Sequence, residues 1–181
     1  MTPAQPTLTY PTKAGPTPIV LHHTRHCLYL HWQPASYLTR CRSSRVPFDW
    51  TLNPYRGCWY GCHYCYARYT HEFLELDPVD GFESTIFVKA IVQPALEREL
   101  RKVHRGQWLA IGTATDPYQP IERRLRVTRA VLACMVRLQG MRISLATKSD
   151  LVLRDLDLLQ ELRRRNRLMV HVTLTTVDPT L

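Results

Sequence analysis

Three cysteines stand close together in one short stretch of the chain, and their spacing is the first sign of chemistry. Cys58, Cys62 and Cys65 follow the pattern CxxxCxxC. Soft thiolate ligands select zinc or iron–sulfur clusters. A closed structural zinc site usually takes four ligands from two separate pairs, and the sequence shows no second pair at such spacing. Three thiolates therefore favour an iron–sulfur cluster with one metal position open to a reactant.

Two histidines near the cysteines leave a different interpretation open. His63 or His71 could complete a four-ligand zinc site, which would close the open position. The chain would then be a non-catalytic zinc-binding module that binds nucleic acid through its basic surface, since its formal net charge is +9. Iron and sulfide in anaerobically prepared protein would support the first interpretation, and zinc would support the second.

The elements that must position the cysteines alternate between strand and helix patterns, which is typical of βα units and a mainly parallel sheet. We expect strands near residues 48–53, 86–89, 108–115, 141–148 and 168–176. We expect helices near residues 93–103, 122–138 and 150–165. The predicted fold class is therefore α/β, with ligand-binding side chains gathered at the carboxyl ends of the strands.

The chain divides into three parts by composition. Residues 1–18 are rich in proline and threonine, and we expect them to form a disordered tail because they offer little apolar surface to bury. Residues 19–46 form an N-terminal extension, and residues 47–181 form the core. No apolar run is long enough to span a membrane, so we expect no membrane contact and a cytoplasmic location.

The cysteine stretch resembles the cluster loop of a known superfamily. Residues 53–68, with the aromatic Tyr64 just before the last cysteine, are similar to the loop of the radical S-adenosylmethionine (SAM) enzymes. Residues 111–122 and 147–149 resemble the spore photoproduct lyase-like, "DNA repair photolyase" branch. The resemblance implies a partial TIM-like barrel, the N-terminal part of a (β/α)6 barrel. Gly57 and Gly61 should permit positive backbone φ angles within the cluster loop.

The resemblance also implies a lyase-like activity. Cys58, Cys62 and Cys65 would hold a [4Fe-4S] cluster, whose open iron binds the amino and carboxylate groups of SAM. Reductive cleavage of SAM would release a 5′-deoxyadenosyl radical, which abstracts a hydrogen atom from the substrate. A flavodoxin-like or ferredoxin-like protein would donate the electron, and the substrate class would be nucleic acid.

Seven residues are candidates for binding SAM by the same resemblance. Lys148 ends a strand and would bind the SAM carboxylate, although a solvated strand-end lysine is the ordinary alternative. Thr113, Thr115 and Asp116 stand where relatives carry a turn that accepts the methionine amino group, although a plain turn explains them nearly as well. The remaining candidates are Tyr64, Thr173 and Thr175. Three residues after the turn could face the substrate, namely Tyr118, Gln119 and Glu122.

The last expected strand tests this architecture. Alternate apolar residues should form an outer face beneath helices, namely Leu168, Val170, Val172 and Leu174. Thr173 and Thr175 would then line the barrel interior, unless the strand is an edge strand with its polar face in water. The chain stops where barrel relatives continue, so we expect a truncated, inactive fragment whose last strand is covered by a missing C-terminal half or a partner chain.

Overall fold

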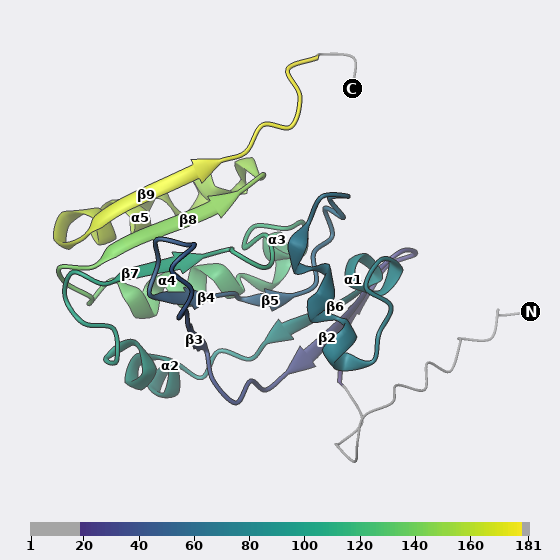
Figure 1. The fold of residues 1–181 in the computed structure, drawn as a ribbon, viewed down its shortest axis with the longest axis horizontal. Coiled ribbons are helices and arrows are strands. Elements are labelled where there is room, and N and C mark those ends of the chain that lie inside the picture. Colours follow the sequence, from purple (N-terminus) through teal and green to yellow (C-terminus); the bar gives the residue numbers. More distant parts are fainter. Residues whose placement is uncertain (1–18, 179–181) are drawn as a thin grey trace, which may run out of the picture.

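The computed structural model describes residues 19–178, and the expected disordered tail lies outside them. Two β-sheets and the helices that accompany them make up a mixed α/β fold (Figure 1). One sheet has the strand order β3-β4-β7-β8-β9 and the other has the order β1-β2-β6-β5. The α/β class expected from the sequence is confirmed.

The five-stranded sheet carries the carboxyl ends where ligands are expected. Strands β4, β7, β8 and β9 are parallel, and β3 joins antiparallel to β4 at one edge. The strands are β3 (Leu38–Arg40), β4 (Trp50–Leu52), β7 (Trp108–Ile111), β8 (Arg142–Thr147) and β9 (Arg167–Val172). Four of the five expected strands are present in this sheet, but β7 ends at Ile111, so residues 113–115 lie in the following loop.

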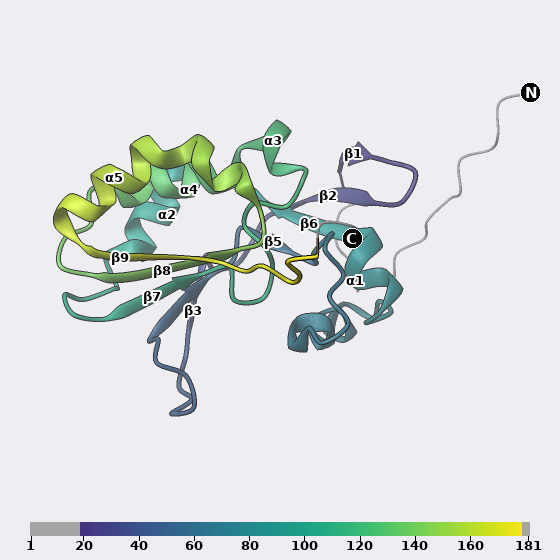
Figure 2. The same ribbon diagram turned by 90° about the horizontal axis from the view of Figure 1, so that it is seen from above.

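Three helices cover one face of this sheet, as Figure 2 shows. They are α2 (Gln93–Leu100), α4 (Val127–Met135) and α5 (Leu156–Arg165). Their apolar sides bury strand residues such as Leu109, Ile143 and Leu145, none of which is exposed to solvent. Each fully buried side chain of this kind stabilises the fold by about 1.5–3 kcal/mol. None of the described helices is long and apolar enough to cross a membrane.

The prediction of a single helix over residues 122–138 is wrong, because the helix is interrupted at Arg126. This residue adopts φ +53° and separates α3 (Glu122–Leu125) from α4. The Glu122 carboxylate accepts the amide N–H of Thr128 at 3.1 Å and that of Arg129 at 3.4 Å, so it caps the start of α4. The carboxylate thus pairs with two backbone N–H groups at the start of the second helix. The apolar periodicity of the sequence continues through this point and gave no sign of the break.

The helix expected over residues 150–165 also begins differently. A 3₁₀ segment, η3 (Asp150–Asp155), precedes α5. The Ser149 hydroxyl accepts the N–H of Leu151 at 3.2 Å and thereby caps this first segment. The helical pattern predicted the extent of the segment but not its tighter first turns.

The second sheet joins the N-terminal extension to the core. It contains β1 (Val20–His23), β2 (Leu28–Trp32), β6 (Thr85–Lys89) and β5 (Tyr55–Arg56). Strand β6, expected in the same parallel sheet as the other core strands, instead pairs parallel with β2 and antiparallel with β5. An alternating pattern identifies a strand and its buried face but not its neighbour, and this explains the error.

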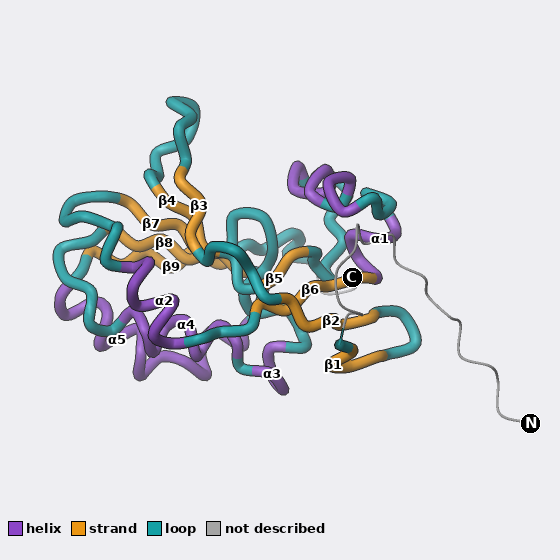
Figure 3. The backbone as a smooth tube through the Cα atoms, turned by 90° about the horizontal axis from the view of Figure 1, so that it is seen from below, coloured by secondary structure: helices purple, strands orange, loops and turns teal. Residues whose placement is uncertain are grey.

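The segment that carries the cysteines connects β5 to β6, two neighbouring strands of the second sheet, and Figure 3 shows it from below beside that sheet. It runs from β5 through two short 3₁₀ helices and one short α-helix into β6. They are η1 (Tyr66–Thr70), η2 (Glu72–Leu74) and α1 (Asp80–Ser84). The loop is therefore held by β5 at one end and by α1 and β6 at the other.

The apolar face expected on the last strand is exposed over most of its length. Val170 is 39% exposed, Val172 is 53% exposed and Leu174 is 77% exposed, while Leu168 packs against the core. Strand β9 is the last strand of its sheet and pairs only with β8 among the described strands. The expectation that helices cover these side chains is wrong beyond Leu168, since Val170, Val172 and Leu174 stay accessible to solvent at the edge of the sheet.

Replacing the buried Lys89 by methionine should stabilise the protein at neutral pH. Lys89 is 8% exposed, and its Nζ has one long hydrogen bond, 3.5 Å to the Tyr37 carbonyl oxygen. Burial lowers the pKa of Lys89 to about 8. The native state then binds this proton more weakly than the unfolded state, so stability rises with pH between about 8 and 10.4.

The Lys89→Met gain should be up to about 3 kcal/mol below pH 8 and should vanish near pH 10.4. Urea unfolding of both proteins at pH 7 and pH 10 measures it. Lys102→Met, at an exposed lysine, is the matched control and should change stability little at either pH. An equal gain in the free energy of unfolding at both pH values would contradict the lowered pKa of Lys89.

Candidate active site

A cavity of about 260 Å³ lies where the cysteine loop meets the carboxyl ends of β7 and β8. Every residue predicted to bind the cluster or SAM lines this cavity except Thr175. Tyr60, Tyr66 and Thr147 line it as well and were not predicted. The structure therefore brings together three cysteines, one lysine and several hydroxyls from segments that are far apart in the sequence.

Two glycines shape the cysteine loop as predicted. Gly57 adopts φ +87° and Gly61 adopts φ +53°. A Cβ on Gly57 would lie 2.9 Å from the Thr85 carbonyl oxygen, closer than van der Waals contact allows. Gly57 thus serves two purposes, because the left-handed conformation turns the chain and the missing side chain lets the loop pack on the backbone at the start of β6.

Arg68 fastens the same loop and was missed from the sequence. Its guanidinium donates to the carbonyl oxygens of Gly61 at 2.6 Å, Cys62 at 3.2 Å and Val79 at 3.0 Å. It also forms an ion pair with Glu83. An arginine three positions after the last cysteine looks like any surface cation in the sequence, so only the folded loop reveals that its donors hold the cysteine backbone.

Cys58 is the most enclosed of the three cysteines, at 8% exposed. Burial raises the pKa of its thiol to about 11, although the backbone N–H of Asp116 donates to its Sγ at 3.4 Å and opposes the rise. A metal must therefore displace this proton in order to bind the thiolate. Amide hydrogen bonds of this kind stabilise thiolate ligands and tune cluster potentials.

The donor set fits a cluster better than a single metal ion. Across residues 19–178, no three His, Cys, Asp or Glu side chains lie close enough together to hold one ion. In a [4Fe-4S] cluster each thiolate binds a different iron, so the three sulfurs need only surround a common space. Cys58, Cys62 and Cys65 meet that condition because all three line the same cavity.

Neither histidine considered for zinc lies at the cavity. His71 is fully buried, its Nε2 donates to the Thr85 carbonyl oxygen at 2.9 Å, and its ring packs against Phe82 with centroids 5.1 Å apart. Burial lowers the pKa of His71, so it is neutral at physiological pH. His63 is exposed and does not line the cavity. The zinc interpretation thus lacks its fourth ligand.

The predicted turn residues Thr113 and Thr115 use their hydroxyl groups for hydrogen bonds that join the segments around the cavity. The Thr115 hydroxyl donates to the Gly57 carbonyl oxygen at 2.6 Å, and Thr113 pairs with Asn53. Asn53 Oδ1 also accepts the N–H of Ala114 at 3.0 Å, which ties the end of β4 to the loop after β7. Asn53, which sequence analysis did not single out, therefore positions the cavity wall.

Asp116 links the ends of two strands through a buried carboxylate. It accepts the N–H of Tyr118 at 2.8 Å, the Thr147 hydroxyl at 2.7 Å and the N–H of Lys148 at 2.7 Å. Burial raises the pKa of this carboxyl even though these hydrogen bonds oppose the rise. Asp116 fixes Lys148 beside the cavity through the backbone of that residue.

Asp116→Ala should therefore lower the free energy of unfolding by about 3 kcal/mol, since it leaves three buried donors without an acceptor. Urea denaturation at pH 7 measures the change. Asp77→Ala is the matched control, because Asp77 accepts two backbone N–H groups at 2.8 and 2.7 Å but is exposed. The control should lose about 1 kcal/mol or less, and an equal loss in both variants would argue against a special role for Asp116.

Lys148 and Tyr64 meet at the cavity. Lys148 Nζ donates to the Tyr64 hydroxyl at 3.0 Å, and this hydrogen bond raises the pKa of the lysine. Lys148 forms no ion pair with a carboxylate in the described part of the chain. Just after β9 the backbone N–H of Thr173 donates to the Thr147 carbonyl oxygen at 2.9 Å, so this residue stays beside the cavity.

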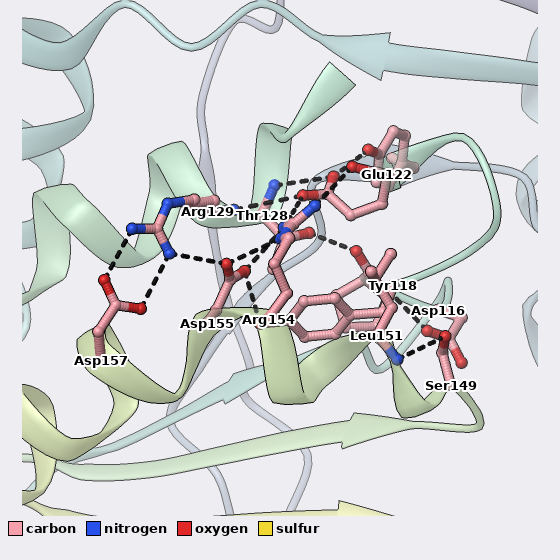
Figure 4. A network of polar contacts seen from close by, with 12 residues as sticks. Asp116, Tyr118, Glu122, Thr128, Arg129, Ser149, Leu151, Arg154, Asp155 and Asp157 are labelled. Atoms are coloured by element: carbon pink, nitrogen blue, oxygen red, sulfur yellow. Dashed lines mark hydrogen bonds and ion pairs between the residues drawn. The ribbon is translucent and has the colours of Figure 1, made fainter. Parts of the chain in front are cut away.

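The three residues that could have faced a substrate are fully buried. Tyr118, Gln119 and Glu122 are all 0% exposed. Gln119 accepts the Trp59 N–H at 3.1 Å and so braces the cysteine loop. Tyr118 and Glu122 belong to a network of buried acids and arginines behind the cavity (Figure 4). The expectation that they face a substrate is wrong, and their role is to support the site.

Comparison with known proteins identifies the family to which this chain is similar. The Radical SAM superfamily model matches residues 52–181. The chain is 38% identical over 140 residues to an uncharacterized protein of Mycobacterium tuberculosis, covering 77% of this chain and 41% of that relative. It is 30% identical over 112 residues to an uncharacterized protein of Methanocaldococcus jannaschii, covering 62% and 40%. An uncharacterized protein of Acidianus two-tailed virus is 26% identical over 134 residues, covering 71% and 43%.

The chain spans about two fifths of the length of these relatives. No solved structure matches it significantly. The family match includes the three cysteines, the cavity they line and the parallel strands that end at it. On this match, the chain belongs to the radical SAM superfamily.

Proposed function

We propose that the protein is a radical SAM enzyme of the spore photoproduct lyase-like branch, with a [4Fe-4S] cluster held by Cys58, Cys62 and Cys65. The observation that carries the proposal is the convergence of these three thiols and Lys148 on one cavity. The chemistry that such a cluster supplies when bound is one-electron cleavage of SAM to methionine and a 5′-deoxyadenosyl radical, which takes a hydrogen atom from the substrate.

The residues of this chain would bind and orient SAM. Lys148 carries a positive charge that forms no ion pair with a carboxylate in the described residues, so it can attract the SAM carboxylate. The Tyr64 ring, 75% exposed, can cover the adenine. Thr173 presents a hydroxyl for the ribose or the carboxylate. Thr113, Thr115 and Asp116 position the wall against which SAM lies.

The fold supports a further part of the proposal, that the parallel strands form part of a barrel wall. Four parallel strands with helices on one face leave the other face free to line an interior (Figure 2). The outer edge of β9 pairs with no described strand. We propose that a strand of a C-terminal half or of a partner chain completes this edge, and that catalysis by the present chain depends on it.

Three other proposals rest on chemistry. A flavodoxin-like or ferredoxin-like protein would supply the electron, since reductive cleavage of SAM needs a one-electron donor. The substrate would be nucleic acid, in keeping with the branch and with the net charge of +9. The cytoplasm is the expected location, because a reducing compartment protects such a cluster.

Electron paramagnetic resonance of anaerobically reconstituted, dithionite-reduced protein, with and without SAM, tests the function. A reduced-cluster signal that SAM alters would support an open-site cluster that binds SAM. A cluster signal indifferent to SAM would refute SAM binding by this chain while keeping the metal site. Colourless protein that contains zinc without iron or sulfide would overturn the proposal in favour of the zinc module.

A further inference from the structure

A second cavity, of about 420 Å³, lies at the opposite end of the parallel strands from the cysteines. In Figure 1 the arrows of β7, β8 and β9 point toward the cysteine end, and the second cavity lies at their tails. Strand β8 has six residues and separates the two cavities by roughly 20 Å. We call this cavity the arginine pocket, because five arginines line it, namely Arg142, Arg163, Arg164, Arg165 and Arg167.

The backbone fixes the shape of the arginine pocket. Its segments are joined by four backbone hydrogen bonds of 2.8–3.0 Å, which are Gly106 N–H to Gly140 O, Gly140 N–H to Arg165 O, Arg142 N–H to Gln107 O and Arg167 N–H to Met141 O. The Asn166 side chain adds three more, accepting from the Met141 N–H and donating to the carbonyl oxygens of Leu138 and Leu162. The arginines therefore project from a rigid frame.

Most of the positive charge at this pocket is not neutralised. Arg164 pairs with Glu161 at 2.7 Å. The guanidinium groups of the other four make no hydrogen bond or ion pair within residues 19–178, and no acidic residue lines the pocket. Arg105 adds a fifth such group, since its Nε lies 2.8 Å from where a Cβ on Gly140 would stand. The carboxyl end of α5 offsets only about half a charge.

Guanidinium groups crowded in this way repel one another, and an anion that bridges them relieves the repulsion. Arg142 and Arg167 are register partners on adjacent strands, which lie about 4.8 Å apart, so neighbouring phosphates could contact both. The planar fork of arginine matches phosphate oxygens in a bidentate manner. A repeating phosphate chain is thus the anion that fits this array.

We propose that the arginine pocket binds the sugar–phosphate backbone of a nucleic acid without regard to base sequence. The only apolar side chain that lines it is Met141, which is 5% exposed, so the pocket lacks the aromatic and apolar centre typical of a protein interface. Because no aromatic side chain lines the pocket, it offers bases no surface for stacking, and binding would be to the backbone. This inference adds to the proposed nucleic-acid substrate a binding site at the far end of the strands, and the site needs neither the cluster nor SAM.

Fluorescence anisotropy of labelled oligonucleotides of about 20 nucleotides, single-stranded and duplex, measures the binding at several salt concentrations. The test variant replaces Arg142, Arg163, Arg165 and Arg167 by glutamine. We expect its affinity at about 0.1 M salt to fall at least about 100-fold. Each lost phosphate contact removes about 0.9 from the slope of log K against log salt for duplex, so the slope should fall by about 3 to 4.

The matched control replaces four other exposed arginines by glutamine and so removes the same charge elsewhere, at Arg42, Arg45, Arg98 and Arg101. We expect the control to lose less than about 3-fold in affinity, and circular dichroism should show that both variants are folded. An equal loss in the control would overturn the proposal, because net charge alone would then explain binding. Equally tight binding of polyglutamate would overturn it in favour of an acidic protein. The measurement uses protein without iron, so failure here leaves the radical SAM proposal untouched.

Discussion

Replacing Cys62 by alanine should abolish cluster binding, with iron falling from about four atoms per chain toward zero. The Cys62 carbonyl oxygen accepts hydrogen bonds from Arg68 and from the N–H of Cys65, at 3.2 and 3.0 Å. Alanine keeps both, so the loop should retain its shape while it loses one thiol. The reduced-cluster resonance should disappear, and any release of 5′-deoxyadenosine should fall at least about 10³-fold, equivalent to about 4 kcal/mol.

Cys134→Ala is the control for this experiment. Cys134 is 6% exposed within the hydrophobic core and does not line the cavity. Its replacement should cost about 1 kcal/mol of stability and leave the iron content unchanged. Full iron content in Cys62→Ala, or equal loss in both variants, would show that Cys62 is not a ligand.

Arg154→Met should destabilise the protein by about 3–5 kcal/mol, because it leaves two buried carboxylates without their shared cation. Arg154 Nη2 lies 2.8 Å from Glu122 Oε1 and 2.8 Å from Asp155 Oδ2, and both acids are 0% exposed (Figure 4). Arg129 still contacts Asp155 at 2.9 Å in the variant, so Glu122 suffers most. Adding Glu122→Gln to Arg154→Met should therefore recover part of the loss.

The pH dependence gives a second check on the same network. Burial alone would raise the pKa of Asp155, but hydrogen bonds from Arg154 and Arg129 outweigh it and leave the pKa below its usual range. The stability that this ionised group contributes is present above the unfolded pKa of about 3.9 and is lost as pH falls through the lower native pKa. The gap between wild type and Arg154→Met should thus narrow in acid.

Urea unfolding at pH 7 and pH 3 measures this gap. Arg164→Met is the matched control, since Arg164 forms an exposed ion pair with Glu161 at 2.7 Å. Such surface pairs contribute less than about 1 kcal/mol, so the control should change little at either pH. If Arg154→Met lowers the free energy of unfolding by less than about 1 kcal/mol, Arg154 is not needed to stabilise the buried carboxylates of Glu122 and Asp155.

Local patterns in the sequence determined much of the fold. Alternating apolar residues identified each strand of the parallel sheet, and the CxxxCxxC spacing pointed to the loop that lines the cavity with three thiols. The same was true of Gly57 and Gly61, since a turn that requires positive φ selects glycine wherever it lies. These features are properties of short segments, which carry their own conformational preferences.

The tertiary structure alone decided which segments meet. It placed β6 beside β2, split the expected helix at Arg126 where the Glu122 carboxylate caps α4, and left Val170 and Val172 in solvent. It also showed that Arg68 and Asn53 hold the cavity wall through hydrogen bonds to distant backbone groups. Strand neighbours, buried ion pairs and side-chain-to-backbone bonds depend on groups far apart in the chain, and no local periodicity records them.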